Sequence, residues 1–201
     1  MLDSKLPQTF WVGLLFLLSF LALAYLLSVA ELKKQHTLPS LGKVENFTLT
    51  NQDGKVTTLA DLTNHVWVAD IIFTRCAGPC PRMTAQMKSI QDKLEPRGLA
   101  PATSTVQLVT LTTDPDYDSP AVMKKYGQHF DADFNRWNFL TGTKSEIGAL
   151  AANSLKLSAT PIDPKDQKNA ADLFIHTTIF VIVDKHAQLR GIFQTGGEDV
   201  D

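Results

Sequence analysis

The segment His65–Leu94, with the sequence HVWVADIIFTRCAGPCPRMTAQMKSIQDKL, decides the fold class. It opens with His65–Thr74, a β-branched and aromatic run of the kind that forms a buried central strand. It closes with Pro81–Leu94, whose apolar residues recur at steps of four, three and four, the spacing of a helical stripe: Met83, Met87, Ile90 and Leu94. The segment therefore predicts a strand and a helix, with both cysteines of the chain at the connection between them.

Strand and helix patterns continue outward on both sides of this segment. Before it, Phe47–Thr50 and Val56–Thr58 flank a turn signal at Asp53-Gly54 and predict a β-hairpin. After it come a predicted strand, helix, strand, helix and closing antiparallel strand pair: Val106–Thr113, Pro120–Tyr126, Trp137–Leu140, a helix led by Thr143, then Leu173–Val183 and Leu189–Phe193. This order predicts an α/β sandwich with a thioredoxin-like arrangement, to which the hairpin is an N-terminal addition.

Composition and charge exclude several classes of protein. The chain has 201 residues, of which 44% are hydrophobic and 20% charged, so it can form a packed core. Its 19 Lys and Arg against 21 Asp and Glu give a net charge of -2 without a basic run, which argues against a nucleic-acid partner. With only 2 cysteines it is not a disulfide-stapled scaffold.

The N-terminal segment predicts a membrane anchor. Leu6–Ala30 has no charged residue, and an apolar helix over Phe10–Ala30 would be roughly 30 Å long, which matches a bilayer core. The alternative is a cleaved signal peptide, because Ser28-Val29-Ala30 resembles a cleavage site, but the apolar run exceeds the ~7–15 residues usual for such signals. We expect an anchor at residues 1–30, a linker at 31–43 and the folded domain at 44–201.

An early anchor followed by a long domain favours export of that domain. We therefore expect a single-pass protein of the bacterial inner membrane, with its soluble domain on the periplasmic or extracytoplasmic side.

The cysteine pair lies in Cys76-Ala-Gly-Pro-Cys80-Pro81. Pro79 disfavours helical geometry at Gly78, and Pro81 fits only the first turn of a helix, which places Cys76 in the loop and Cys80 at the helix N-terminus. The positive end of the helix dipole should lower a thiol pKa there, above all that of Cys80. Because a bridge closing so short a loop would stabilise the fold little, the pair indicates metal ligation or disulfide exchange.

A metal ion bound by these thiolates would need a third ligand. The candidates are the five histidines, His36, His65, His129, His176 and His186. His176 heads an apolar strand whose start should lie beside the cysteine loop in a thioredoxin-like fold, whereas the other four suit solvated or strand-edge positions. A histidine with a purely structural role in the core remains the alternative for His176.

Three aspartates at alternate positions, Asp114, Asp116 and Asp118, superficially match the start of an EF-hand loop. The sixth position would be Ser119 instead of Gly and the twelfth Lys125 instead of Glu, so a calcium site is not expected. We interpret the cluster as capping of the helix that follows.

At these residues the chain resembles the SCO/SenC family of membrane-anchored, thioredoxin-fold proteins. The resemblance covers most of residues 40–195 and rests on an ordered set of motifs: Phe73-Thr-Arg-Cys-Ala-Gly-Pro-Cys-Pro-Arg-Met83, Asp114-Pro-Asp-Tyr-Asp-Ser-Pro120, Trp137-Asn-Phe-Leu-Thr-Gly142 and His176-Thr-Thr. It implies copper binding, as Cu(I) or Cu(II), and assistance in cytochrome c oxidase assembly, with Cys76, Cys80 and His176 as the ligands and oxidase subunit II as the partner. The chain departs from the family at Ala77-Gly78, where many members have Pro-Asp.

Three functions are compatible with these residues. The first is a copper chaperone, since soft thiolates and an imidazole suit Cu(I). The second is a thiol–disulfide oxidoreductase that keeps partner cysteines reduced, which would not require His176. The third, a thiol peroxidase, would use one cysteine to attack peroxide and the other to resolve it, but no motif calls for it.

Overall fold

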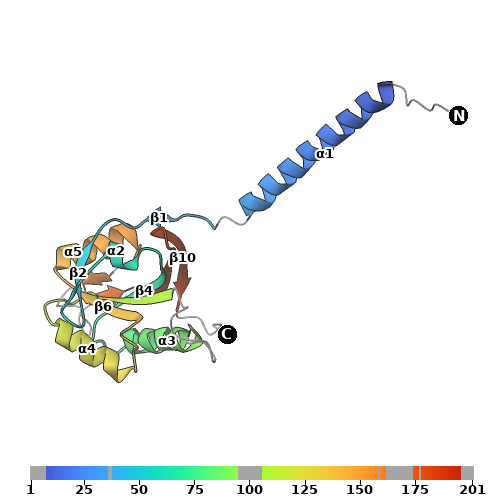
Figure 1. The fold of residues 1–201 in the computed structure, drawn as a ribbon. Helices are drawn as coiled ribbons and strands as arrows, with labels where there is room; N and C mark the ends of the chain where they lie inside the picture. Colours follow the sequence, from blue (N-terminus) through green and yellow to red (C-terminus); the bar gives the residue numbers. More distant parts are fainter. Residues whose placement is uncertain are drawn as a thin grey trace. The chain divides into compact units, whose positions relative to one another are not determined.

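The computed structural model describes residues 8–35, 38–94, 106–157, 159–161, 174–176 and 178–195. The chain divides into two compact units, Met1–Pro39 and Ser40–Asp201, and each is described by itself (Figure 1).

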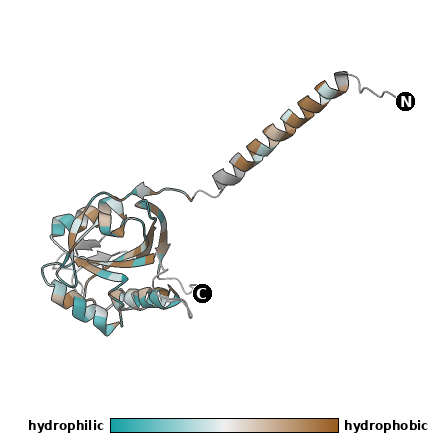
Figure 2. Ribbon diagram, viewed as in Figure 1, coloured by the Kyte–Doolittle hydropathy of each residue, from teal (hydrophilic) through white to brown (hydrophobic). Residues whose placement is uncertain are grey.

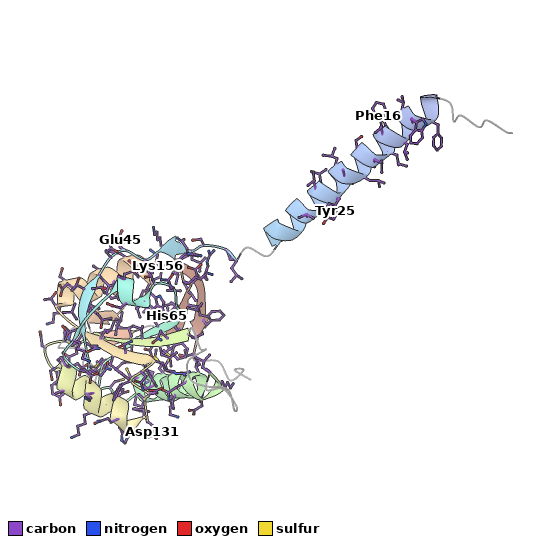
Figure 3. All side chains as sticks on the ribbon, viewed as in Figure 1. Phe16, Tyr25, Glu45, His65, Asp131 and Lys156 are labelled. Atoms are coloured by element: carbon purple, nitrogen blue, oxygen red, sulfur yellow. The ribbon has the colours of Figure 1, made fainter. Side chains whose placement is uncertain are left out.

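The described part of the first unit consists mainly of one long helix, α1 (Gln8–Gln35). Within it, Phe10–Val29 forms 20 residues with a mean hydropathy of 2.5, none of them buried. Much of this helix is coloured as hydrophobic in Figure 2. Large side chains such as Phe16 and Tyr25, 72% and 69% exposed, project from it (Figure 3). At 1.5 Å per residue this stretch is about 30 Å long, so its length and composition suit a membrane span, and the predicted apolar N-terminal helix is confirmed.

The second unit is built on an eight-stranded sheet with the order β1-β10-β9-β4-β5-β6-β2-β3 among the described residues. Its strands are β1 (Gly42–Lys43), β2 (Thr48–Asn51), β3 (Val56–Thr58), β4 (Val66–Ile72), β5 (Val106–Thr112), β6 (Trp137–Thr141), β9 (Ile179–Val183) and β10 (Gln188–Gln194). The central strand β4 is parallel to β5 and antiparallel to β9, and β5 is parallel to β6. The predicted hairpin, β2–β3, extends the sheet beside β6, and β9–β10 is the predicted antiparallel pair.

Helices cover both faces of this sheet (Figure 1). The helical elements are α2 (Leu59–Leu62), α3 (Pro79–Leu94), α4 (Pro120–His129), α5 (Lys144–Gly148) and the π-helix η2 (Ala149–Ser154). Leu62 and Ile147, from α2 and α5, pack in one apolar cluster, whereas Met87 and Met123, from α3 and α4, pack in a second. The predicted α/β sandwich is therefore confirmed.

Two helices begin at residues suited to that position. Ser119 is the N-cap of α4, where its side chain accepts a hydrogen bond of 3.4 Å from the Val122 N–H, and Pro120 occupies the first helical turn. Thr143 and Glu146 form a reciprocal capping box at the start of α5. These capping residues fix where α4 and α5 begin after the strands β5 and β6.

One predicted strand is wrong. Leu173–Val183 is not a single strand, because β8 (Phe174–His176) pairs with β7 (Ala159–Pro161) in a separate two-stranded sheet. The chain joins the main sheet again only at Ile179, where β9 begins. A continuous apolar pattern does not reveal which partner strand each half of the segment has.

Candidate metal and thiol site

The cysteines lie where β4 passes into α3. The strand ends at Ile72, the Cys76 N–H donates to the Phe73 carbonyl over 3.2 Å, and Cys80 lies in the first turn of α3. A strand before the loop and a helix after it fix both ends of this short connection. The predicted placement of the cysteine pair is confirmed.

Neither cysteine forms a disulfide, and both side chains are largely removed from solvent. Cys76 is 9% exposed and Cys80 is 0% exposed, and they pack with Ile72, Phe73 and the ring of Tyr126. The side chains of the two cysteines interact directly with each other. A reagent or metal ion therefore approaches the pair from the Cys76 side.

The expected lowering of the Cys80 pKa is wrong. Its interaction with Cys76 and its burial both raise the pKa of Cys80 well above the ordinary value, and a hydrogen bond from the Phe73 backbone offsets only part of this. The neighbouring sulfur and the removal of a thiolate from water together outweigh the positive end of the helix. Placement at a helix N-terminus therefore does not lower the pKa of this buried thiol.

The side chain of Asp118 is directed to the cysteine loop, although the sequence suggested a helix cap. It is 0% exposed and accepts a hydrogen bond of 3.1 Å from the Thr74 N–H, a second from the Thr74 hydroxyl and a third from the Thr112 hydroxyl. Burial raises the pKa of Asp118, and the Thr112 and Thr74 donors oppose that rise. Capping of α4 belongs to Ser119 alone, so the interpretation of Asp118 as part of a cap is wrong.

The other two aspartates of that cluster have separate partners. Asp114 accepts a hydrogen bond of 2.5 Å from the Arg75 guanidinium, which also lies 4.2 Å from the centre of the Tyr117 ring. The exposed Asp116 pairs with Lys144 over 2.5 Å. The three carboxylates of this cluster therefore turn to different partners.

Asp70 is a buried acid that sequence analysis missed. It lies on β4 opposite Thr110 of β5 and is 0% exposed, and within the described residues no hydrogen bond of good geometry reaches either carboxyl oxygen. Burial raises the pKa of Asp70 to about 7, and the neighbouring Thr110 hydroxyl offsets this only in part. The only signal in the sequence was a single acidic residue inside the apolar run Val66–Ile72.

His176 ends β8, where its backbone lies opposite Ala159. Its side chain lies outside the described residues, as does all of His36. Among the side chains that are described, no group of three or more His, Cys, Asp and Glu forms a metal site. The structure thus brings Cys76 and Cys80 together, and the third ligand stays a prediction.

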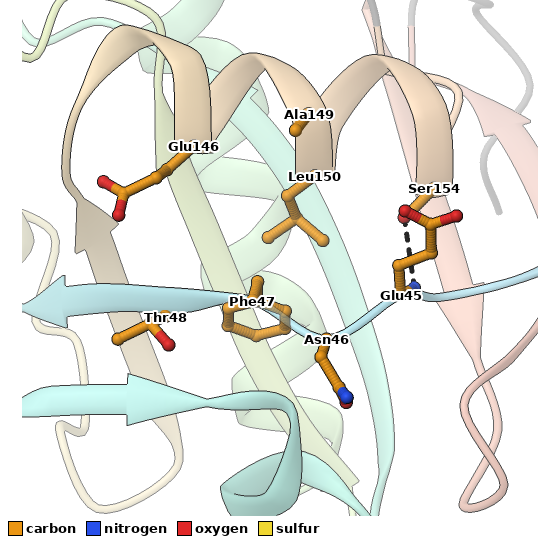
Figure 4. A pocket seen from close by; sticks show the side chains of 8 residues that line it. All are labelled: Glu45, Asn46, Phe47, Thr48, Glu146, Ala149, Leu150 and Ser154. Carbon is orange, nitrogen blue, oxygen red and sulfur yellow. Dashed lines mark hydrogen bonds between the residues drawn. The ribbon is translucent and has the colours of Figure 1, made fainter.

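A separate groove lies away from the cysteines, between β2 and the α5–η2 segment (Figure 4). Its volume is about 270 Å³, and at one end a hydrogen bond of 3.2 Å joins the Glu45 N–H to the Ser154 hydroxyl. The lining residues are Glu45, Asn46, Phe47, Thr48, Glu146, Ala149, Leu150 and Ser154. None of the candidate site residues lines it.

The fold and the site define a class of protein: a thioredoxin-like domain with a Cys-x-x-x-Cys pair between its central strand and the following helix. In the sequence, an apolar helix precedes this domain. The family model described as SCO1/SenC matches residues 36–200. The chain belongs to the SCO1/SenC family.

Three relatives illustrate this membership. The SCO1 protein homolog of Bacillus subtilis (strain 168) is 34% identical over 163 residues, which cover 79% of each chain. The structure of BsSco, described as a member of the Sco family of cytochrome c oxidase assembly proteins with a disulfide switch, has a TM-score of 0.63 at 32% identity and covers 78% of this chain and 87% of that one. Yeast Sco1 with copper bound has a TM-score of 0.61 at 25% identity and covers 79% and 82%.

Proposed function

We propose that this protein is a membrane-anchored copper chaperone that binds one copper ion through Cys76, Cys80 and His176. The proposal rests on one observation above all: the side chain of Cys76, in the loop before α3, interacts directly with that of Cys80, in the first turn of α3. Two thiolates and an imidazole are soft enough for Cu(I), and an added water or other oxygen would accommodate Cu(II). The copper in the yeast Sco1 relative supports the same choice of metal.

The electrostatics of the pair favour a metal ligand over a free thiolate. The neighbouring Cys76 sulfur and burial raise the pKa of Cys80, so a positive charge beside the sulfur favours loss of its proton. A bound metal ion supplies that charge, because coordinating thiols are deprotonated. Because Cys76 is 9% exposed, a metal bound by the pair could still be reached by and passed to another protein.

The receiving protein in this proposal is cytochrome c oxidase subunit II, with its copper centre. Support comes from BsSco, described as belonging to a family of oxidase assembly proteins. We place the domain on the extracytoplasmic side of a bacterial inner membrane, with α1 as its single span, since a long domain after an early apolar helix is readily exported.

The test is a competition titration with a Cu(I) chelator on the reduced, full-length protein in detergent. We expect one copper per chain for the wild type and none retained by Cys76→Ser or Cys80→Ser. His176→Ala should weaken binding more than tenfold, or more than 1.4 kcal/mol, because loss of even an outer partner of a metal ligand costs about 10–100-fold. His186→Ala, in the exposed turn between β9 and β10, is the matched control and should bind as the wild type does.

A thiol–disulfide oxidoreductase is the second candidate, favoured by the direct contact between Cys76 and Cys80. Such an enzyme needs both sulfurs but not His176. Disulfide-reductase activity measured on the same variants separates the two functions. If His176→Ala binds copper as tightly as the wild type while both Cys→Ser variants lose reductase activity, the oxidoreductase function replaces the chaperone.

A further inference from the structure

We propose that Asp118 is a positioning residue, which holds the loop carrying Cys76 in the place where the two sulfurs meet. For copper affinity this inference rests on the proposed function, whereas for thiol chemistry it stands independently of copper.

The hydrogen bonds of Asp118 join three parts of the chain. Its carboxylate precedes α4, and it accepts from the backbone and hydroxyl of Thr74, in the cysteine loop, and from the hydroxyl of Thr112, at the end of β5. Asp118, which accepts these three hydrogen bonds, is 0% exposed. A buried carboxylate with three donors of fixed position is a rigid junction, because each lost bond would leave a donor without water.

This junction fixes the half of the loop that holds Cys76. Thr74 lies two residues before Cys76, and the loop continues through the bond from the Cys76 N–H to the Phe73 carbonyl. The Cys80 half is held separately, by α3 and by the Thr84 hydroxyl, which donates 3.0 Å to the Cys80 carbonyl. The distance between the sulfurs therefore depends on two anchor points, of which Asp118 provides the first.

The role of Asp118 is geometric and not that of a cap or of a charge partner. Ser119 already caps α4, and the nearby Arg75 guanidinium is bonded to Asp114. The partners of Asp118 are neutral groups, which an asparagine can also satisfy, since its oxygen accepts and its amide group donates to a hydroxyl. Asp118→Asn should therefore preserve the junction, and Asp118→Ala should release it.

The experiment compares Asp118→Ala, Asp118→Asn and Gln91→Ala in the full-length protein. Gln91 is the matched control: it is 2% exposed and bridges to the Asp131 carbonyl and the Asp133 N–H, but it lies about 16 Å further along α3 than Cys80. Three quantities are measured: the thiol–disulfide equilibrium against glutathione, the alkylation rate of Cys76, and Cu(I) affinity by chelator competition. Urea unfolding reports the stability of each variant.

For Asp118→Ala we expect the disulfide equilibrium to shift at least tenfold toward the dithiol, about 30 mV, because freed sulfurs meet less often. Cys76 should be alkylated at least tenfold faster, and copper affinity should fall at least tenfold. Asp118→Asn should stay within twofold of the wild type in all three, and Gln91→Ala should lose stability without moving them.

If Asp118→Ala changes only stability, as Gln91→Ala does, the inference is overturned. It is equally overturned if Asp118→Asn behaves like Asp118→Ala, which would assign the effect to charge. Should Asp118→Ala fail to fold, Thr74→Val removes one of the three bonds and must shift the equilibrium in the same direction, or the inference fails. A wild type that binds no copper, together with a shifted equilibrium in Asp118→Ala, would refute the chaperone proposal and support this one.

Discussion

Asp70 on β4 and Thr110 on β5 lie opposite each other in the parallel register, at the centre of the sheet and away from water. The carboxyl group has a folded-state pKa of about 7, above its ordinary 3.8. The unfolded chain therefore loses this proton more readily than the folded one. It follows that the contribution of Asp70 to the free energy of unfolding decreases as the pH rises from about 4 to about 7.

The first prediction is that Asp70→Asn removes this pH dependence in the reduced, metal-free protein. Between pH 5 and pH 8 the wild type should lose about 2–3 kcal/mol of stability that the variant keeps. Urea unfolding of both proteins at the two pH values measures the difference, in which any pH-independent cost of the amide cancels. Equal losses of stability in the two proteins would show that Asp70 is already ionised at pH 5.

The second prediction concerns the reactivity of the thiols. Cys76 is 9% exposed, whereas Cys80 is fully buried with a raised pKa, so Cys76 should be alkylated first and Cys80 much more slowly. Peptide mass spectrometry after timed alkylation across a pH range measures both rates. A Cys80 rate equal to that of Cys76, with a midpoint below the free value of ~8.5, would contradict the burial described here.

The third prediction compares two glycines. A Cβ at Gly127 would lie 2.8 Å from ring atoms of both Phe134 and Phe139, while a Cβ at Gly148 would meet nothing within 4 Å. Gly127→Ala should destabilise the domain by about 1–3 kcal/mol through overpacking. Gly148→Ala should be neutral or stabilise by up to about 1 kcal/mol, since alanine favours helix. Thermal unfolding of the two variants measures the difference in stability. Equal unfolding midpoints would refute the tight contact at Gly127.

The fourth prediction is that the apolar helix stays on the mature protein. The span Phe10–Val29 is longer than the apolar core of a signal peptide, so it should anchor the chain in the membrane fraction. Intact mass analysis of the native protein should include residues 1–30. An N-terminus at Glu31 would instead establish cleavage after Ala30.

Much of the fold could be predicted because its signals are local. The buried run that became β4, the apolar stripe of α3 and the proline positions around Cys80 each depend on near neighbours in sequence. They sufficed to place the cysteine pair between a strand and a helix. The β2–β3 hairpin was likewise predictable from its Asp53-Gly54 turn signal.

The remaining features depend on contacts between distant parts of the chain. Asp118 meets Thr74, 44 residues earlier, so its spacing within the acidic cluster suggested only a local cap. The raised pKa of Cys80 results from its contact with Cys76 and from burial, neither of which a sequence pattern measures. The separation of β8 from β9 depends on pairing with Ala159–Pro161, a segment with no strand pattern of its own.

The way in which the second unit begins has a mechanical consequence. Hydrogen bonds of 2.8 Å from the N–H groups of Leu41 and Val44 flank the short pairing of β1 with β10, and the Ser40 hydroxyl adds a bond of 2.7 Å to Gln188. Any tension transmitted along the chain from residues 38–39 loads these bonds first. Between them and β4 stand two further strands, β10 and β9. A force applied through residues 38–39 would therefore separate β1 from β10 and leave the cysteine loop unstrained.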